Sequence, residues 1–335
     1  MMKLFALLIL FQTFWVAGFA QSLPFPNKGA ILQRTNLVVR WKASKHPWPK
    51  TLWTYQMVPN NFSPMAVSYL MAIGSFTEKD KIVSDTNGVF FGNLYGDPNL
   101  RISFTEGEIN YSRVSHGPIT NLVTDMPGTN QIFQSTTNLL SKLGISLSEL
   151  VKTKDGKPAI NFFTHEFYTP PTNTTDSTIT NVETVGTYFH RQIDGVKVWI
   201  GGEGQIDFNR DGQISGIMLM WRGVKHDKLY AAATPKQIIQ WIREGKAALP
   251  KGILGGMGSM IPIDWSTVKK VTIKKATAYY WGEFFLGERE HRPIFPSPVI
   301  PYAVLQATID TGTTNIDVQI SCPIIDETKP LKVNP

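Results

Sequence analysis

The chain has 335 residues, of which 42% are apolar, 18% charged and 11% aromatic. This composition excludes a disordered or collagen-like chain and is sufficient for two or three globular domains. The formal net charge of +7 favours anionic partners, but the lysines and arginines are scattered along the sequence, so a nucleic-acid-binding function is not expected.

The N-terminus has the order of segments that is typical of a secretory signal. Lys3 precedes an apolar run from Leu4 to Ala20, and the run ends in small residues. We expect residues 1–20 to be a signal peptide that is cleaved near Ala20, which predicts a secreted or periplasmic protein without an integral membrane span in the mature chain. The alternative is an uncleaved anchor, for which a run of 17 residues is short.

Three helices are predicted from capping residues and apolar periodicity. After a loosely structured lead-in at 21–50, the first helix begins at Ser63-Pro64, with the serine as cap and the proline in the first helical position. The second spans 129–145, where isoleucine and leucine side chains share one face. The third begins at Thr234-Pro235 and has the strongest apolar face.

Strand-like runs follow each predicted helix and are separated by Gly, Asp and Pro. They are GVFFGNLY, LRISF and EINYSRV after the first helix, AINFFTHEFY, TVGTYFHRQI, VKVWIGGEGQIDF and QISGIMLMWRG after the second, and KKVTIKKATAYYWGEF, YAVLQATID and NIDVQISCPI after the third. The lysine-rich run at 268–276 alternates with Val and Ile, which favours a solvated strand face over a nucleic-acid patch.

One helix followed by several antiparallel strands, three times over, indicates tandem modules of one type. We therefore predict an α+β fold built of such modules. The predicted division is a signal peptide at 1–20, a lead-in with a first module at 21–125, a central module at 126–231 and a C-terminal module at 232–335.

The stretch DFNRDGQISGIM at 207–218 has Asp, Asn, Asp and Gly at the spacing of a calcium loop. Both flanks alternate as strands, however, and the twelfth position is Met218, where such a loop needs a bidentate glutamate. Asp211-Gly212 between two alternating runs predicts a hairpin turn, because glycine accepts the positive φ that these turns require. The same Asp-Gly turn motif occurs at Asp194-Gly195 and Asp155-Gly156.

Residues 186–222 resemble the PepSY and FTP family of modules, which occur in metalloprotease propeptides and in exported bacterial proteins. The matching residues are Phe189, Arg191, Gln192, Gly195, Val196, Val198, Gly201, Gly202, Asp211 and Gly212. The resemblance implies a PepSY- or cystatin-like fold, a helix packed on a curved antiparallel sheet, with a binding or restraining role and no catalysis of its own. Unlike the protease precursors, the chain contains no HExxH motif.

Catalytic and cofactor motifs are absent from the sequence. None of the six histidines lies three to five residues from another, so the spacing predicts no zinc site, and no nucleophile elbow or phosphate-binding loop is present. We expect no cofactor and no metal. Cys322 is the only cysteine, which excludes an intrachain disulfide, and its apolar surroundings favour a buried core thiol over a nucleophile.

The candidate binding residues are Tyr188, His190, Trp221 and Arg222. Tyr188 and His190 alternate with Phe189 along one strand, so they occupy the face opposite to it. Since Phe189 suits the core, we expect Tyr188 and His190 on the free side of the sheet. Trp221-Arg222 has the make-up of an interface anchor and is predicted at the same side or its rim, although core packing is the alternative for Trp221.

Three functional hypotheses follow. The first is an exported, non-enzymatic binding or regulatory protein of PepSY-like modules that binds a protein or peptide partner. The second, suggested by the basic net charge, is a secreted binder of an anionic cell-wall or glycan ligand. The third is a hydrolase whose motif is not recognisable.

Overall fold

The computed structural model describes residues 36–60, 62–92, 97–113, 126–169, 179–199, 201–254, 260–282 and 297–332. The chain divides into two compact units. The central unit comprises Gln56–Lys225 and Gly282–Pro298, and the terminal unit comprises Met1–Tyr55, His226–Trp281 and Val299–Pro335. The module boundaries predicted at residues 125 and 231 stay predictions, and the predicted signal peptide at 1–20 lies outside the described residues.

All three predicted helices are confirmed. They are α2 (Pro64–Gly74), α3 (Thr129–Lys142) and α4 (Pro235–Arg243). The hydroxyl groups of Ser63 and Thr234 accept hydrogen bonds from backbone N–H groups in the first turns of α2 and α4, and proline begins both helices. The sequence therefore determines where these helices begin, because the caps satisfy N–H groups that have no partner within the helix.

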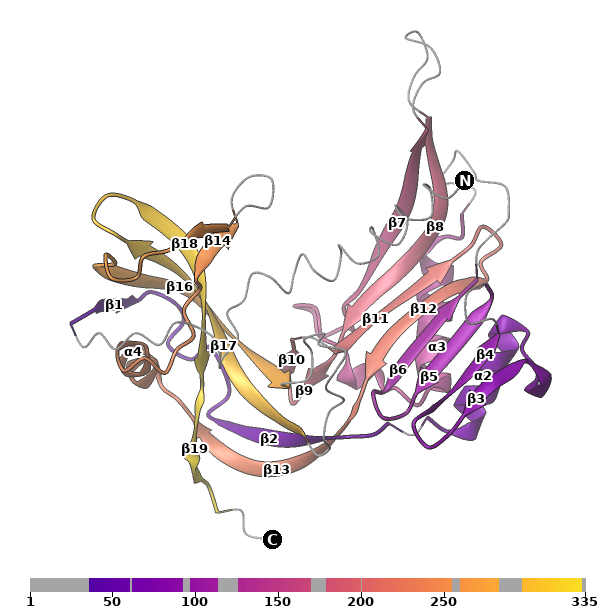
Figure 1. Cartoon of the computed structure of the whole chain (residues 1–335), viewed down its shortest axis with the longest axis horizontal. Helices are drawn as coiled ribbons and strands as arrows, with labels where there is room; N and C mark the ends of the chain where they lie inside the picture. Colours follow the sequence, from indigo (N-terminus) through magenta and orange to yellow (C-terminus); the bar gives the residue numbers. More distant parts are fainter. Residues whose placement is uncertain are drawn as a thin grey trace. The chain divides into compact units, whose positions relative to one another are not determined.

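The central unit contains an eight-stranded antiparallel sheet (Figure 1). Its order is β3-β4-β5-β6-β12-β11-β8-β7. The strands are β3 (Lys81–Ser84), β4 (Gly88–Gly92), β5 (Asn99–Ser103), β6 (Glu108–Ser112), β7 (Ile160–Thr169), β8 (Ile179–His190), β11 (Gly202–Phe208) and β12 (Ile214–Trp221). The short strands β9 (Gln192–Ile193) and β10 (Val196–Val198), which lie between β8 and β11 in the sequence, form a hairpin.

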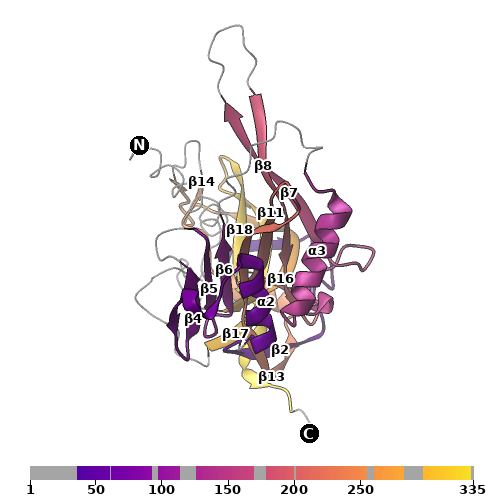
Figure 2. The same ribbon diagram turned by 90° about the vertical axis from the view of Figure 1, so that its right-hand side faces the viewer.

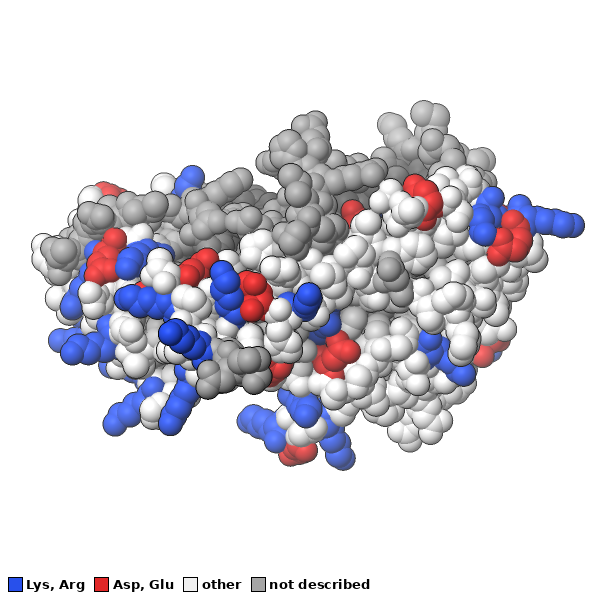
Figure 3. All heavy atoms as spheres, turned by 90° about the horizontal axis from the view of Figure 1, so that it is seen from below, with Lys and Arg blue, Asp and Glu red and all other residues white. Residues whose placement is uncertain are grey.

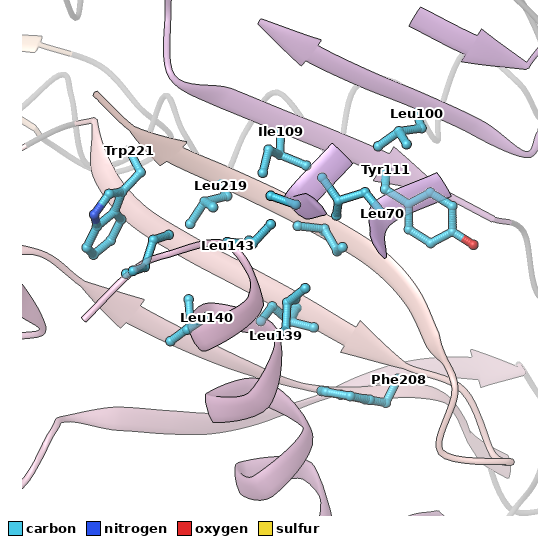
Figure 4. Packing of buried hydrophobic residues seen from close by; sticks show 14 of the residues in the cluster. Leu70, Leu100, Ile109, Tyr111, Leu139, Leu140, Leu143, Phe208, Leu219 and Trp221 are labelled. Atoms are coloured by element: carbon cyan, nitrogen blue, oxygen red, sulfur yellow. The ribbon is translucent and has the colours of Figure 1, made fainter. Parts of the chain in front are cut away.

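One hydrophobic core lies beneath both helices of the central unit. Figure 2 shows α2 and α3 on the same side of the sheet. Leu70 of α2 and Leu139 of α3 are buried with Ile109 of β6 and Leu219 of β12 (Figure 4). Burying a leucine or isoleucine side chain contributes about 1.5–3 kcal/mol, so the sheet and both helices are stabilised together.

The terminal unit is built around a second sheet, in which the strands follow the order β19-β13-β2-β17-β16. In addition, β1 pairs in parallel with β16, and β18 pairs with β17. The strands are β1 (Val38–Trp41), β2 (Thr51–Val58), β13 (Gly223–Ala232), β16 (Lys270–Gly282), β17 (Ser297–Asp310), β18 (Asn315–Pro323) and β19 (Ile325–Pro330). By the unit bounds, one to three residues at one end of β2, β13, β16 and β17 belong to the central unit. A separate two-stranded sheet consists of β14 (Gly252–Leu254) and β15 (Met260–Pro262). Helix α4 packs against β1 and β18.

The predicted fold class, tandem modules of one helix on its own curved sheet, is wrong. Strands dominate the chain, and they form two large sheets instead of three small ones. The strands after α2 and those after α3 join through the pairing of β6 with β12 and share one core. Neither set forms a separate layer with a core of its own, because each helix buries its apolar face in the common core.

The local strand predictions are confirmed, but the sequence patterns did not predict that segments distant in sequence pair with these strands. The predicted runs correspond to β4 to β8, β10 to β12 and β16 to β18. Within the predicted loose lead-in, Val38–Trp41 forms β1 on the edge of β16. β2 and β13 were missed as strands, and both belong to the terminal unit's sheet. Cys322 is fully buried, as expected, and burial raises the pKa of its thiol.

Candidate functional site

The face of the eight-stranded sheet opposite α2 and α3, here called the open face, carries a row of side chains brought together by strand register. Directly opposed residues on neighbouring strands point to the same face. From β7 across to β4 the row is Asn161, Tyr188, Gln205, Met218, Asn110, Arg101 and Phe90. None of these seven residues is fully buried, and 38% of Met218 is exposed.

Tyr188 of this row forms a hydrogen-bonded pair with His190, two residues further along β8. The Tyr188 hydroxyl lies 2.5 Å from Nε2 of His190, and the two rings meet edge to face with centroids 4.6 Å apart. Glu203 of β11 is directly opposite His190, and its Oε2 atom lies 3.9 Å from the Nδ1 atom. The open face therefore holds a Tyr–His–Glu cluster at the junction of β8 and β11.

The electrostatics of this cluster favour neutral side chains. Burial, and secondarily the charge of Lys197, lowers the pKa of His190 to about 4. Burial also raises the pKa of Tyr188 to about 12, with a further contribution from Glu203, and raises the pKa of Glu203. At neutral pH the hydrogen bond therefore joins two uncharged groups, and the imidazole tautomer determines whether the Tyr188 hydroxyl or Nε2–H is the donor.

A second polar group on the open face joins β7 to β11. Nε2 of His165 lies 3.7 Å from Oδ1 of Asp207, and Nε2 of Gln205 donates to the same oxygen over 3.1 Å. Side-chain hydrogen bonding to Asp207 raises the pKa of His165, although burial acts in the opposite direction. His190 faces Glu203 on the adjacent strand β11, and His165 reaches across β8 to Asp207, which gives this surface a defined arrangement of donors and acceptors.

Trp221 does not lie on the open face, so its predicted placement there is corrected. Trp221 is 2% exposed and belongs to the core cluster. Along β12 the buried residues are Ile217, Leu219 and Trp221, and the alternation of the strand puts Met218 on the opposite face. The aromatic ring that resembled an interface anchor is therefore a core residue.

Trp221 also contacts both members of an ion pair at the edge of the core. The guanidinium group of Arg191 lies 5.1 Å from the centroid of the Trp221 ring and 2.8 Å from a carboxylate oxygen of Glu149. The indole N–H of Trp221 donates to the same oxygen over 3.2 Å. Because a buried cation needs such partners, this triad explains why Arg191 can alternate with apolar residues in the sequence.

Arg222 is buried too, which again differs from the predicted rim position. Its Nε atom donates to the backbone oxygen of Glu106 over 3.0 Å, and one terminal nitrogen lies 3.5 Å from the sulfur of Met57. Burial lowers the pKa of Arg222 to about 10, against the attraction of Glu106 and Glu108. Of the four predicted residues, the structure places Tyr188 and His190 together on the open face and uses the other two inside the unit.

The stretch 207–213 forms the predicted hairpin between β11 and β12. Gly212 has φ of +73°, its N–H donates to the Asn209 carbonyl, and the Gln213 N–H donates to the Asn209 side chain. The turns at Asp194-Gly195 and Gly156 also have positive φ. Within the described ranges, no group of three or more His, Cys, Asp or Glu residues could hold a metal ion. That the chain binds no calcium stays a prediction.

The sequence analysis missed Glu203, Gln205 and Met218 as members of the site. The signal was present in GEGQIDF, because Glu203, Gln205 and Asp207 alternate with buried residues. Such alternation identifies one polar face, but it does not say which strand lies beside β11. Pairing with β8 and β12 brings these side chains next to Tyr188 and His190.

Comparison with known proteins identifies no family. No protein-family model matches the chain, and no curated protein is significantly similar to it. A solved structure of an uncharacterized protein from Eubacterium rectale is similar over 88% of this chain and 89% of its own, with 7% identity and a TM-score of 0.43. Likeness at this level supports no conclusion about function. The resemblance to PepSY and FTP modules stays a prediction.

The helices in the described part of the chain were compared with the requirements for a membrane span. In those ranges, no helix combines the length and the apolar character needed to cross a bilayer.

Proposed function

We propose that this chain is an exported, non-enzymatic binding protein that holds a protein or peptide partner on the open face of its eight-stranded sheet. The observation that carries the proposal is the cross-strand row from Asn161 to Phe90. Among its side chains are two aromatic rings, a methionine and an arginine, and it lacks Lys, Asp and Glu. Protein interfaces are enriched in aromatic, Met and Arg residues and depleted of Lys, Asp and Glu.

The physical properties of the row suit a polypeptide partner. Asn161, Gln205 and Asn110 offer amide donors and acceptors that match a peptide backbone. Met218 lies at the centre of the row, and its flexible side chain adapts to the shape of a partner. A sheet stiffened by seven neighbouring strand pairings holds these groups in place, so little ordering is needed on binding.

The Tyr188–His190 pair favours recognition over catalysis. General acid–base catalysis works best when the pKa of the catalytic group is close to the working pH. Here the pKa of His190 lies near 4 and that of Tyr188 near 12, so neither group exchanges its proton readily at neutral pH. The pair acts instead as a fixed polar feature beside the row.

Site-specific photo-crosslinking tests the proposal. A photoreactive amino acid is placed at Met218, on the open face, and in a second variant at Phe133, on α3. The two positions are matched, because 38% of Met218 and 37% of Phe133 is exposed and both lie in the central unit. Cross-linking is carried out in the source cells, and the adducts are identified by mass spectrometry.

We expect a discrete polypeptide adduct at position 218 that is absent at position 133. Met218→Asp should abolish recovery of the same polypeptide with the purified protein, whereas Phe133→Asp should leave it unchanged, since a buried carboxylate without a partner is costly in an interface. Equal adducts at both positions, or none at position 218, would refute binding by the open face.

A further inference from the structure

The terminal unit has a polar surface that is independent of the open face and that we call the outer face. Four adjacent strands, β18, β17, β16 and β1, form it. One side of these strands is apolar, with Val39, Ile273 and Leu305 buried, and α4 packs against β1 and β18. The other side is mostly polar, although the exposed Val38 of β1 also lies on it. Strand register places on it Arg40, Lys270, Thr272, Lys274, Gln306, Thr308, Asp310, Asn315, Asp317 and Gln319.

Cations and carboxylates are unevenly distributed over the outer face. Towards β17 and β18 the charges are paired, with Lys270 lying 3.5 Å from Asp310 and Lys274 lying 3.0 Å from Asp317. On β1, at the other edge, Arg40 is exposed, and Lys42 follows directly after the strand. Among the residues that the structure describes, no carboxylate forms a salt bridge with Arg40. The outer face therefore combines neutralised pairs with a cationic edge.

The outer face is also hollowed. A shallow depression of about 500 Å³ is lined by Lys270, Thr272, Lys274, Thr308, Asp310, Asn315 and Asp317. Its lining thus offers hydroxyl, amide, carboxylate and ammonium groups side by side. Nearby on the same face of β18, Oε1 of Gln319 is buried without a hydrogen-bond partner in the described part of the chain, and such an acceptor is costly unless a donor reaches it.

The long-range field of the terminal unit is positive. Its described residues include 15 Lys and Arg against 7 Asp and Glu, whereas the central unit has 13 against 14. Figure 3 shows Lys and Arg side chains crowded over the surface at the left of the view, which belongs to the terminal unit. The chain contains no Asp or Glu before Glu78, so the segment that includes β1 carries only positive charge. This field attracts an anionic ligand from a distance.

From these observations we infer that the outer face binds an anionic glycan, a polymer that carries both carboxylates and sugar hydroxyls. Arg40, Lys42 and the field of the unit attract the carboxylates. Asp310 and Asp317 accept hydrogen bonds from hydroxyl groups, and Thr308 and Asn315 can both donate and accept. Four strands spaced about 4.8 Å apart give a surface about 14 Å wide, which accommodates several sugar rings in a row.

The paired carboxylates distinguish this ligand from other polyanions. A polymer of phosphates alone offers no hydroxyl donors, and it would be repelled by Asp310 and Asp317. A lipid surface is disfavoured for a different reason. Membrane-binding surfaces combine cations with apolar side chains that insert between lipids. On β1 the large apolar residue exposed beside Arg40 is Val38, and Trp41 is engaged with Trp48 and with the Ser44 carbonyl.

Binding to defined polymers tests the inference. The full mature chain is titrated with polygalacturonate, neutral dextran, polyphosphate and phosphatidylglycerol vesicles. In low salt, Arg40→Glu combined with Lys42→Glu should weaken polygalacturonate binding at least about 10-fold, because two attractions become repulsions that are poorly screened. Lys251→Glu combined with Lys332→Glu makes the same change of charge on other exposed elements of the terminal unit and should weaken binding at most about 2-fold.

A second variant isolates the hydroxyl contacts. Thr308→Val combined with Asn315→Ala keeps every charge and should weaken polygalacturonate binding about 3- to 10-fold, as the loss of one or two hydrogen bonds does. Thermal unfolding of each variant confirms that the fold is intact. Three outcomes would overturn the inference: absence of polygalacturonate binding, equal loss in the Lys251/Lys332 control, or polyphosphate or vesicles binding as tightly as polygalacturonate. None of these outcomes bears on the open face of the central unit.

Discussion

The central unit buries two charged side chains, whereas no charged side chain is fully buried among the described residues of the terminal unit. In the central unit, Arg191 and Arg222 are buried and held by carboxylate, carbonyl and aromatic partners. In the terminal unit, the carboxylates of Asp317 and Asp326 pair with lysines on the surface, and hydrogen bonds from their neighbours lower the pKa of both groups. The excess of positive charge belongs entirely to the terminal unit.

This difference shows that net charge by itself is a poor guide to a binding site. A buried charge must be paired, so the charges inside the central unit serve its stability and are not available to a ligand. An exposed pair contributes little to stability, so the charges of the terminal unit are available to partners. The two proposals follow this difference: the one for the central unit is neutral, interface-like recognition, and the one for the terminal unit is recognition of an anion.

The largest expected effect concerns the triad of the central unit. Trp221→Ala should lower the free energy of unfolding by about 3–5 kcal/mol, because it opens a cavity in the core and exposes the partners of the indole ring. Met218 lies three residues earlier on the same strand but on the open face, so Met218→Ala should lower the free energy of unfolding by less than about 1 kcal/mol. Denaturant unfolding of both variants measures the difference. A small loss for Trp221→Ala would restore it as a candidate interface residue.

The pH dependence of stability is the next largest effect. An imidazole in the unfolded chain has a pKa near 6.5, whereas His190 in the folded protein has a pKa of about 4. Above about pH 6.5 both states are neutral. As the pH falls from about 6.5 to about 4, the unfolded chain takes up a proton that the folded chain does not, so stability falls by about 3 kcal/mol.

Denaturant unfolding at several pH values, compared with His190→Gln, isolates this contribution. The raised pKa of His165 acts in the opposite sense, since its contribution is present at low pH and is lost as the pH rises through the folded pKa. Direct titration of both imidazoles by NMR separates the two. Identical pH profiles for the wild type and His190→Gln would contradict the burial of His190.

The smallest effect compares one ion pair from each unit. Glu149→Gln leaves the buried Arg191 with a neutral partner and should lower the free energy of unfolding by about 1–3 kcal/mol. This loss is smaller than for a fully buried ion pair, because about a third of the Glu149 side chain is exposed. Asp317→Asn removes an exposed ion pair with Lys274 and should leave the free energy of unfolding unchanged within experimental error. Equal losses for the two variants would remove the distinction between the units.

Local features of the sequence sufficed to predict most of the elements. Ser63 and Thr234 begin their helices because their hydroxyls cap the first turns. Gly212 and Gly195 lie in the turns between strands because they adopt positive φ, which most other residues avoid. Alternation along β8 correctly separated Phe189 from Tyr188 and His190. In each case the cause lies within a few residues of the element itself.

Tertiary structure decided everything that depends on which strands are neighbours. Alternation showed that Trp221 and Met218 occupy opposite faces of β12, but only packing against α2 and α3 decided that Trp221 faces inward. The pairing of β6 with β12 merged two expected modules into one sheet, and β1 joined a strand more than 200 residues away in sequence. The sequence determined the elements and their two faces, whereas long-range pairing and burial, which optimise the whole core at once, selected the neighbours and the inward side.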